Sequence, residues 1–265
     1  MDERAGRPSQ ELPEHVAHNR EYWDANAEWW AERGARDWAR TEPVWGIWGI
    51  PEAELRVLPE DMTGMDAVEL GCGTAYVSAW MARRGARVTG IDNSARQLET
   101  ARRLAAQHGL DLTLVHGNAE ATPFADESFE FAISEYGAAI WCDPYEWVPE
   151  AHRLLRPGGR LVFMGNHPIM ALCTPLSGGD AGFSLERDYF GLHRLDYRDL
   201  EEDPGGVEFN LPFSGWLALF SRVGFEVEAL LEPRAPDSAA GSRFAVPAEW
   251  AKRFPSEHVW KLRKR

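Results

Sequence analysis

One short stretch, VELGCGTAY at residues 68–76, restricts the fold of this chain more than any other. An apolar run leads into Gly71 and Gly73, and an amphipathic segment follows, which predicts a strand, a glycine turn and a helix. Such a turn places backbone N–H groups beside a ligand. Tyr76 stands where a dinucleotide fingerprint has its third glycine. Because that glycine lets the helix pack closely beneath a pyrophosphate, the turn favours a nucleoside without phosphates.

Short apolar runs and amphipathic segments continue to alternate from about residue 66 to 165. This alternation indicates successive βαβ units on a parallel sheet. Ser94 and Gln97 form a capping box at a helix start, and Gly109 supplies the matching stop. The segment 156–159, Arg-Pro-Gly-Gly, is expected to turn the chain into the fifth strand. We expect strands at 67–70, 86–91, 112–115, 129–134, 160–164, 225–231 and 258–262, and further helices at 76–84, 145–155 and 211–223.

Two acidic residues near the glycine turn bear on the ligand. Asp92 ends the second predicted strand, about 20 residues beyond the glycines, where a carboxylate usually accepts hydrogen bonds from ribose hydroxyls. Its alternative role is a helix cap, but the glycines upstream favour the ribose. Glu69 interrupts a strand that should be buried on both faces, where an unpaired carboxylate is costly. It either binds a ligand's ammonium group or accepts hydrogen bonds from the turn's own N–H groups.

Four motifs in chain order carry a resemblance to a known family: ELGCGT at 69–74, Asp92, NAEATPF at 118–124 and LRPGG at 155–159. Together they resemble the motif series of class I S-adenosylmethionine-dependent methyltransferases, and most closely the branch that includes quinone-ring and other small-molecule methyltransferases. The resemblance covers about residues 66 to 165. It implies an α/β fold with a Rossmann-like, seven-stranded, mostly parallel sheet, a helical N-terminal cap and an insertion before strand six.

The resemblance also implies S-adenosyl-L-methionine as the cofactor. Gly71 and Gly73 would lie beside its methionine part, Asp92 would bind the ribose, and Asn118 would contact the adenine edge. An aromatic residue of the Trp-rich N-terminal segment is a candidate lid; Tyr22 and Trp29 share one helical face, as do Trp23 and Trp30, and core packing is the alternative. The predicted cofactor-binding residues are Tyr22, Trp29, Glu69, Gly71, Cys72, Gly73, Asp92, Asn93, Gln97, Asn118, Ala119 and Glu135.

The expected reaction is methyl transfer by in-line displacement to a small organic acceptor, whose reacting atom stays open. Such a reaction needs positioning but no protein nucleophile, and a general base only if the acceptor must lose a proton. The candidates for that base are His167, Glu135 and Tyr136, which follow predicted strands at the edge where open α/β sheets bind ligands. For His167 the alternative is a loop histidine with a local hydrogen bond. Candidates for the acceptor site in the insertion are Tyr189, Phe190 and His193.

We expect residues 1–15 to be disordered, 16–60 to form the helical cap, and 61–265 to form the methyltransferase domain, with an acceptor-site insertion at 168–210. The net charge of −14 argues against nucleic acid or an anionic membrane as partner. The three separated cysteines suggest neither a disulfide framework nor a metal site. With no secretion signal in the polar N-terminal residues, we expect a cytoplasmic protein. Alternative functions are an NAD-dependent oxidoreductase and a non-catalytic S-adenosylmethionine-binding protein, and the oligomeric state stays open.

Overall fold

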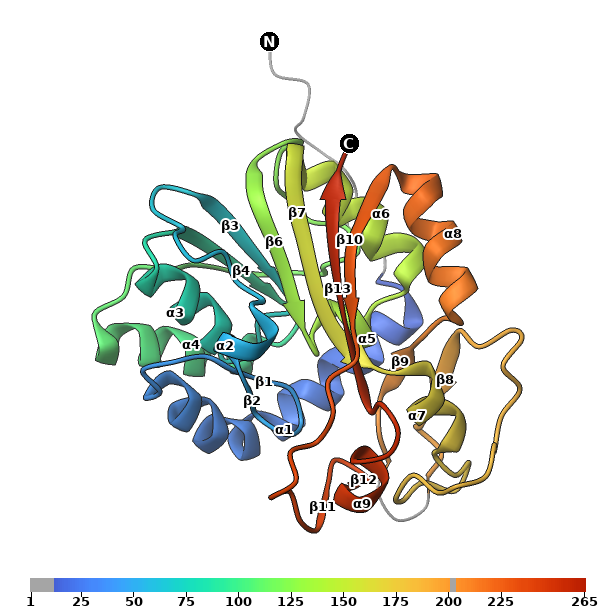
Figure 1. Ribbon diagram of the computed structural model, residues 1–265. Helices are drawn as coiled ribbons and strands as arrows, with labels where there is room; N and C mark the ends of the chain where they lie inside the picture. The colour runs from blue at the N-terminus through green and yellow to red at the C-terminus, as the bar shows by residue number, and fades with distance from the viewer. Residues whose placement is uncertain (1–11, 201–203) are drawn as a thin grey trace.

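The computed structural model describes residues 12–200 and 204–265. A seven-stranded sheet in the order β10-β13-β7-β6-β3-β4-β5 forms its centre (Figure 1). The strands from β3 to β7 pair in parallel, and β13 runs antiparallel to both of its neighbours. The expected Rossmann-like, mostly parallel sheet is therefore confirmed. Its strands are β3 (Asp66–Leu70), β4 (Arg87–Asp92), β5 (Thr113–His116), β6 (Phe129–Glu135), β7 (Leu155–Asn166), β10 (Phe225–Leu231) and β13 (Glu257–Lys264).

One boundary differs from the sequence prediction. The segment 156–159 lies inside β7 and is not a turn before it, because Leu155 already pairs with Phe129 of β6. The register then shifts, so that Arg160 pairs with Phe131. The extra residues form a bulge, which bends the strand while its pairing continues on both sides.

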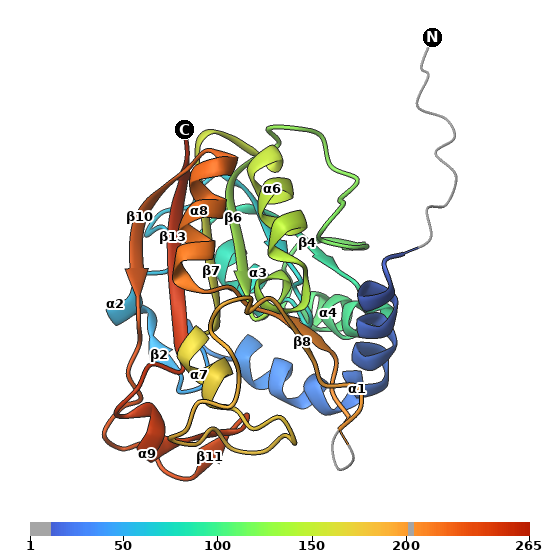
Figure 2. The same ribbon diagram turned by 90° about the vertical axis from the view of Figure 1, so that its right-hand side faces the viewer.

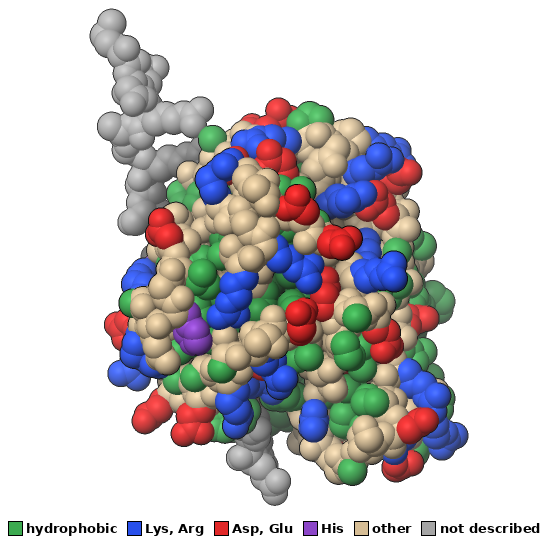
Figure 3. All heavy atoms as spheres, turned by 60° about the vertical axis from the view of Figure 1, so that its left-hand side comes forward, with side chains coloured by type: hydrophobic (Ala, Val, Ile, Leu, Met, Phe, Trp, Pro, Cys, Tyr) green, Lys and Arg blue, Asp and Glu red, His purple; other side chains and the backbone are tan. Residues whose placement is uncertain are grey.

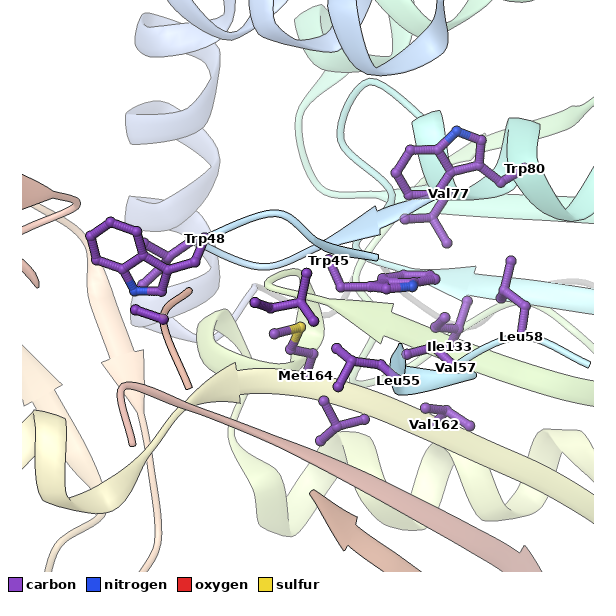
Figure 4. Packing of buried hydrophobic residues seen from close by; sticks show 14 of the residues in the cluster. Trp45, Trp48, Leu55, Val57, Leu58, Val77, Trp80, Ile133, Val162 and Met164 are labelled. Atoms are coloured by element: carbon purple, nitrogen blue, oxygen red, sulfur yellow. The ribbon is translucent and has the colours of Figure 1, made fainter. Parts of the chain in front are cut away.

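Helices cover both faces of the sheet. On one face α6 (Pro144–Leu154) and α8 (Phe213–Val223) pack their apolar sides against residues such as Phe163 and Trp260 (Figure 2). On the other face α2 (Glu52–Leu55) and α3 (Tyr76–Arg83) enclose a second cluster with the rings of Trp45 and Trp80, whose centroids are 5.5 Å apart (Figure 4). A third cluster joins α1 (Glu14–Trp38), α3 and α4 (Ala95–His108).

The cap elements gather at the carboxyl ends of the parallel strands. Helix α1 (Glu14–Trp38) crosses beneath these ends (Figure 1). Residues 1–11 of the segment expected to be disordered lie outside the described residues, and Glu14 already begins α1. The remaining elements at this end are β1 (Val44–Trp45), β2 (Ile50–Pro51), α5 (Ala138–Trp141), α7 (Pro168–Cys173), β8 (Arg194–Asp196), β9 (Val207–Phe209), β11 (Ser242–Arg243), β12 (Val246–Pro247) and α9 (Ala248–Ala251).

The surface carries charges of both signs despite the net negative charge. On the face that Figure 3 shows, basic and acidic side chains lie interspersed around apolar ones. No helix within residues 12–200 and 204–265 has the length and apolar character needed to cross a membrane.

Candidate active site

Three cavities lie at the carboxyl ends of the parallel strands. The inner cavity is enclosed by the glycine turn after β3, the ends of β4 and β6, and α1. The central cavity, of about 960 Å³, lies between α1, α5, α7 and the β8–β9 and β11–β12 hairpins. The outer cavity, of about 970 Å³, lies along the second half of α1. The inner and central cavities share Trp23, Trp30, Tyr76, Glu135, Tyr136 and Trp141, so they lie side by side.

The glycine turn brings the backbone to the inner cavity. Gly71 has φ +75°, and a Cβ there would lie 2.6 Å from the backbone nitrogen of Ala138, so a side chain would collide with the next element. Gly73 has φ +50°, and a Cβ there would point into open space. Ala75 completes the turn with φ +61°, a conformation that is uncommon for a residue with a side chain. The turn thus leaves room for a ligand against its backbone.

Asp92 holds this turn and lines the inner cavity. Its Oδ2 accepts a hydrogen bond of 2.6 Å from the N–H of Gly73, and its Oδ1 accepts one of 2.8 Å from the N–H of Ser94. Burial raises the pKa of Asp92, and the two N–H donors oppose that rise. Each carboxylate oxygen keeps a further lone pair for a ligand hydroxyl.

Glu69 is bound by the helix that follows the turn, and not by the turn's own N–H groups as the structural alternative expected. Its Oε2 accepts hydrogen bonds from the N–H and the hydroxyl of Ser78, at 2.7 and 2.5 Å, in the first turn of α3. Burial raises its pKa to about 8. Glu69 borders the inner cavity, and both of its hydrogen-bond donors belong to Ser78 of the helix beneath the turn.

Gln97 provides an unused polar atom in the inner cavity. The Oγ of Ser94 accepts the N–H of Gln97 at 3.1 Å, which is one half of the predicted capping box. The Gln97 side chain does not complete the box: its Oε1 is buried and has no hydrogen-bond partner in the part of the chain that the structure describes. Because buried polar atoms are normally paired, this oxygen points to a ligand donor.

Most of the predicted cofactor-binding residues surround the inner cavity. They are Glu69, Gly71, Cys72, Gly73, Asp92, Asn93, Gln97, Asn118, Ala119 and Glu135. Tyr22 and Trp29 do not line it, and this part of the prediction is corrected: Tyr22 borders the central cavity, and Trp29, 64% exposed, borders the outer one. Trp23 and Trp30, on the neighbouring helical face, line the inner cavity instead.

The rotation of α1 about its axis is fixed by long-range hydrogen bonds. Asn19 donates to the carbonyls of Trp141 and Val207 and accepts from the N–H of Val207. Arg20 donates to Asn93, which in turn donates to the carbonyl of Val16. Helical spacing alone makes the pairs Tyr22/Trp29 and Trp23/Trp30 equivalent. The sequence therefore gives no signal of which pair faces the inner cavity.

Two tyrosines at the junction of the inner and central cavities, Tyr76 and Tyr136, donate their hydroxyl hydrogens to glutamate side chains. The Tyr76 hydroxyl donates to Oε2 of Glu135, whose Oε1 accepts the N–H of Gly46 at 3.2 Å. The Tyr136 hydroxyl donates to Oε1 of Glu257 at 2.8 Å. Burial raises the pKa of Glu135, whereas its hydrogen bond from Tyr76 lowers it. Sequence reasoning identified Glu135 and Tyr136 but not Tyr76, which was noted only as a missing glycine.

His167 is excluded from this junction by its position. It is 1% exposed and lines none of the three cavities. Its Nδ1 accepts the N–H of Ile169 at the start of α7, and its Nε2 lies 2.8 Å from Glu232. The local, structural alternative therefore describes this histidine. The insertion residues Tyr189, Phe190 and His193 do not line the cavities either; Phe190 is 89% exposed, and His193 contacts Asp143.

Comparisons with known proteins show that this chain is similar to methyltransferases. Residues 68–163 match the family model described as a methyltransferase domain. The chain is 36% identical over 96 residues to a ubiquinone biosynthesis O-methyltransferase of Ruegeria pomeroyi, covering 36% of this chain and 39% of that protein. It is 31% identical over 147 residues to the Roseobacter denitrificans protein of the same name, and this match covers 51% of this chain and 57% of that protein. The chain thus spans about 40 to 57% of the length of these two relatives.

A solved structure extends the similarity beyond the matched segment. An S-adenosylmethionine-dependent methyltransferase from Mesorhizobium loti superposes with a TM-score of 0.65 at 27% sequence identity, covering 83% of this chain and all of that one. The family match and these relatives give no support to an NAD-dependent oxidoreductase.

Proposed function

We propose that this chain, which carries a class I S-adenosylmethionine-dependent methyltransferase domain, transfers a methyl group to a small organic acceptor in the central cavity. The observation that carries the proposal is that the inner and central cavities adjoin at Tyr76, Glu135 and Tyr136. A cofactor in the first cavity and an acceptor in the second would meet beside these side chains. Holding two reactants in contact is the main service that such an enzyme performs.

The residues of the inner cavity fit S-adenosylmethionine, which supplies an electrophilic methyl group when it is bound. Asp92 would accept hydrogen bonds from the ribose hydroxyls, and the unpaired Oε1 of Gln97 offers a further acceptor. The open space at Gly73 admits the methionine part against the backbone. The rings of Trp23 and Trp30, which border both cavities, suit a positively charged sulfonium.

Glu135 is the side chain that we assign to the acceptor's proton, if the acceptor has one to lose. Its burial at the junction raises its pKa, which makes the carboxylate a stronger base than an exposed one. Tyr76 positions it by donating a hydrogen bond to Oε2. Tyr136 borders the same junction but donates its hydroxyl hydrogen to Glu257, and burial and that carboxylate raise its pKa, so we assign it packing rather than proton transfer.

The acceptor class follows from the cavity and from the relatives. A volume of about 960 Å³ with aromatic walls suits a ring-bearing small molecule. The names of the two curated relatives, which refer to ubiquinone biosynthesis and to O-methylation, support a ring as well. The net charge of −14 disfavours nucleic acid. The atom that receives the methyl group stays open.

Calorimetry with S-adenosylhomocysteine and with NAD tests which class of cofactor the protein binds. We expect S-adenosylhomocysteine to bind and NAD not to bind. Asp92→Asn should weaken binding about tenfold or more, because hydrogen bonds to a charged group contribute about 1.5–3 kcal/mol. Asp111→Asn, at an exposed position, is the matched control. Binding of NAD alone, or unchanged affinity in Asp92→Asn, would contradict the proposal.

A transfer assay separates an enzyme from a non-catalytic binding protein. The protein is incubated with methyl-labelled S-adenosylmethionine and a small-molecule extract, and we expect label in a small product. Binding of the cofactor without labelling of any fraction would support the non-catalytic alternative.

A further inference from the structure

We propose that the acceptor carries a positively charged amino group, which binds in a corner of the central cavity formed by Glu208, Trp141 and Tyr197. The inference rests on the proposed function, since it takes the central cavity as the acceptor site. We call these three residues the amine corner.

Glu208 faces the cavity because of its place on a strand. Its neighbours in β9, Val207 and Phe209, are buried in the core, and side chains alternate along a strand, so Glu208 points to the other side. The Nδ2 of Asn166 donates to its Oε2 at 3.1 Å. Burial raises the pKa of Glu208 to about 7. The carboxyl group is therefore held in position but costly to ionise without a partner.

Among the described residues, no cationic side chain pairs directly with this carboxylate. Within residues 12–200 and 204–265, no Lys, Arg or His side chain forms a salt bridge with Glu208. The Arg187 guanidinium lowers the pKa of Glu208 and lies 5.6 Å from the ring centroid of Tyr197, but it donates its hydrogen bonds to the backbone carbonyls of Ala171 and Thr174 and not to Glu208. A ligand ammonium would supply the missing charge.

Two glycines let the side chains of Trp141 and Tyr197 approach the backbone of the same corner. A Cβ at Gly206 would lie 2.6 Å from the indole of Trp141, and one at Gly205 would lie 2.9 Å from Cβ of Tyr197. Both glycines directly precede β9, so the two side chains pack against the backbone that leads to Glu208. The Tyr197 pKa is raised by burial and by the Glu208 charge, which agrees with their proximity. Aromatic faces beside a carboxylate are the standard surroundings of a bound ammonium.

The other ionisable side chains of the central cavity also favour a positively charged ligand. The ionisable side chains of this cavity are Glu135, Asp180, Asp199, Glu208 and Arg33, apart from the tyrosines. The Arg33 guanidinium lies over the rings of Trp30 and Phe244, at 5.4 and 4.7 Å from their centroids. The acidic excess attracts a cation and repels a carboxylate or phosphate.

Calorimetry on the protein saturated with S-adenosylhomocysteine tests this proposal with two probes of the same ring size, tyramine and 4-ethylphenol. Tyramine should bind about tenfold more tightly, since a desolvated cation–π contact and an ion pair together easily supply that factor. Glu208→Gln, which keeps an acceptor for Asn166, should remove this preference and leave the affinity for 4-ethylphenol unchanged. Asp199→Asn, on the same cavity wall, should change tyramine affinity less than about threefold if the corner itself is responsible.

The outcomes separate the two proposals. Equal affinity for the two probes, no binding of tyramine, or an unchanged preference in Glu208→Gln would overturn the amine corner while S-adenosylhomocysteine binding stays intact. Failure of the wild-type protein to bind S-adenosylhomocysteine would overturn the proposed function and the amine corner with it.

Discussion

Glu257 allows a quantitative test of how burial controls the stability of this fold. It is fully buried at the start of β13. Its Oε1 accepts hydrogen bonds from the N–H of Ile47, at 2.7 Å, and from the hydroxyl of Tyr136. Its Oε2 has no partner among the described residues. Burial raises its pKa from 4.5 to about 8. The substitution Glu257→Gln can keep both hydrogen bonds to Oε1 and removes the charge.

The sign of the pH dependence follows from the raised pKa. Between pH 4.5 and about 8 the folded protein holds a proton on Glu257 that the unfolded chain has already lost. The free energy of unfolding therefore falls as the pH rises through this interval, by about 1.4 kcal/mol per pH unit for one such group. The stabilisation is complete only below the unfolded pKa. The amide that Glu257→Gln introduces does not titrate, so the variant should lack this contribution.

The experiment compares urea unfolding of the two proteins from pH 6 to pH 8, above the sequence pI of about 5.0. The stability difference in favour of Glu257→Gln should grow by about 2–3 kcal/mol over this range, which corresponds to roughly 5–10 °C in Tm. Glu249→Gln, at a side chain that is 82% exposed, is the control and should leave the slope unchanged. Parallel stability curves for wild type and Glu257→Gln would refute the reasoning, because they would show that Glu257 titrates alike in both states.

Three further predictions concern single side chains. Trp23→Ala should weaken S-adenosylmethionine binding at least about tenfold, and Trp29→Ala less than about twofold, in calorimetry, because only the first ring borders the inner cavity, where it would face the sulfonium; equal losses would mean that the assigned helix face is wrong. Glu135→Gln should lower the methyl-transfer rate about 10²- to 10⁴-fold if a proton is removed, whereas His167→Gln should change it little; the reverse order would restore His167 as the base. Ser78→Ala should lower the free energy of unfolding by about 1–3 kcal/mol in urea, because it removes a donor to the buried Glu69 carboxyl; a negligible change would show that this hydrogen bond contributes nothing.

The sequence by itself determined the sheet and the glycine turn. Hydrophobic runs, helix stops such as Gly109 and the spacing from Gly73 to Asp92 are local properties, and the structure has the corresponding strands and helices within a few residues. These signals are strong because a buried parallel strand needs an apolar run and a close backbone turn needs glycine. The same local patterns located most of the inner cavity, since the ends of adjacent parallel strands meet at one edge of the sheet.

Only the tertiary structure decided which side chains outside the sheet reach the site. Trp23 and Trp29 are indistinguishable by spacing, and hydrogen bonds from Asn19 to residues far along the chain choose between them. His167 follows the fifth parallel strand as a base would, but its neighbours bury it away from the cavities. Glu208, in an irregular stretch, gave no local signal at all. Side-chain placement of this kind depends on contacts between distant segments, and a single sequence does not record those contacts.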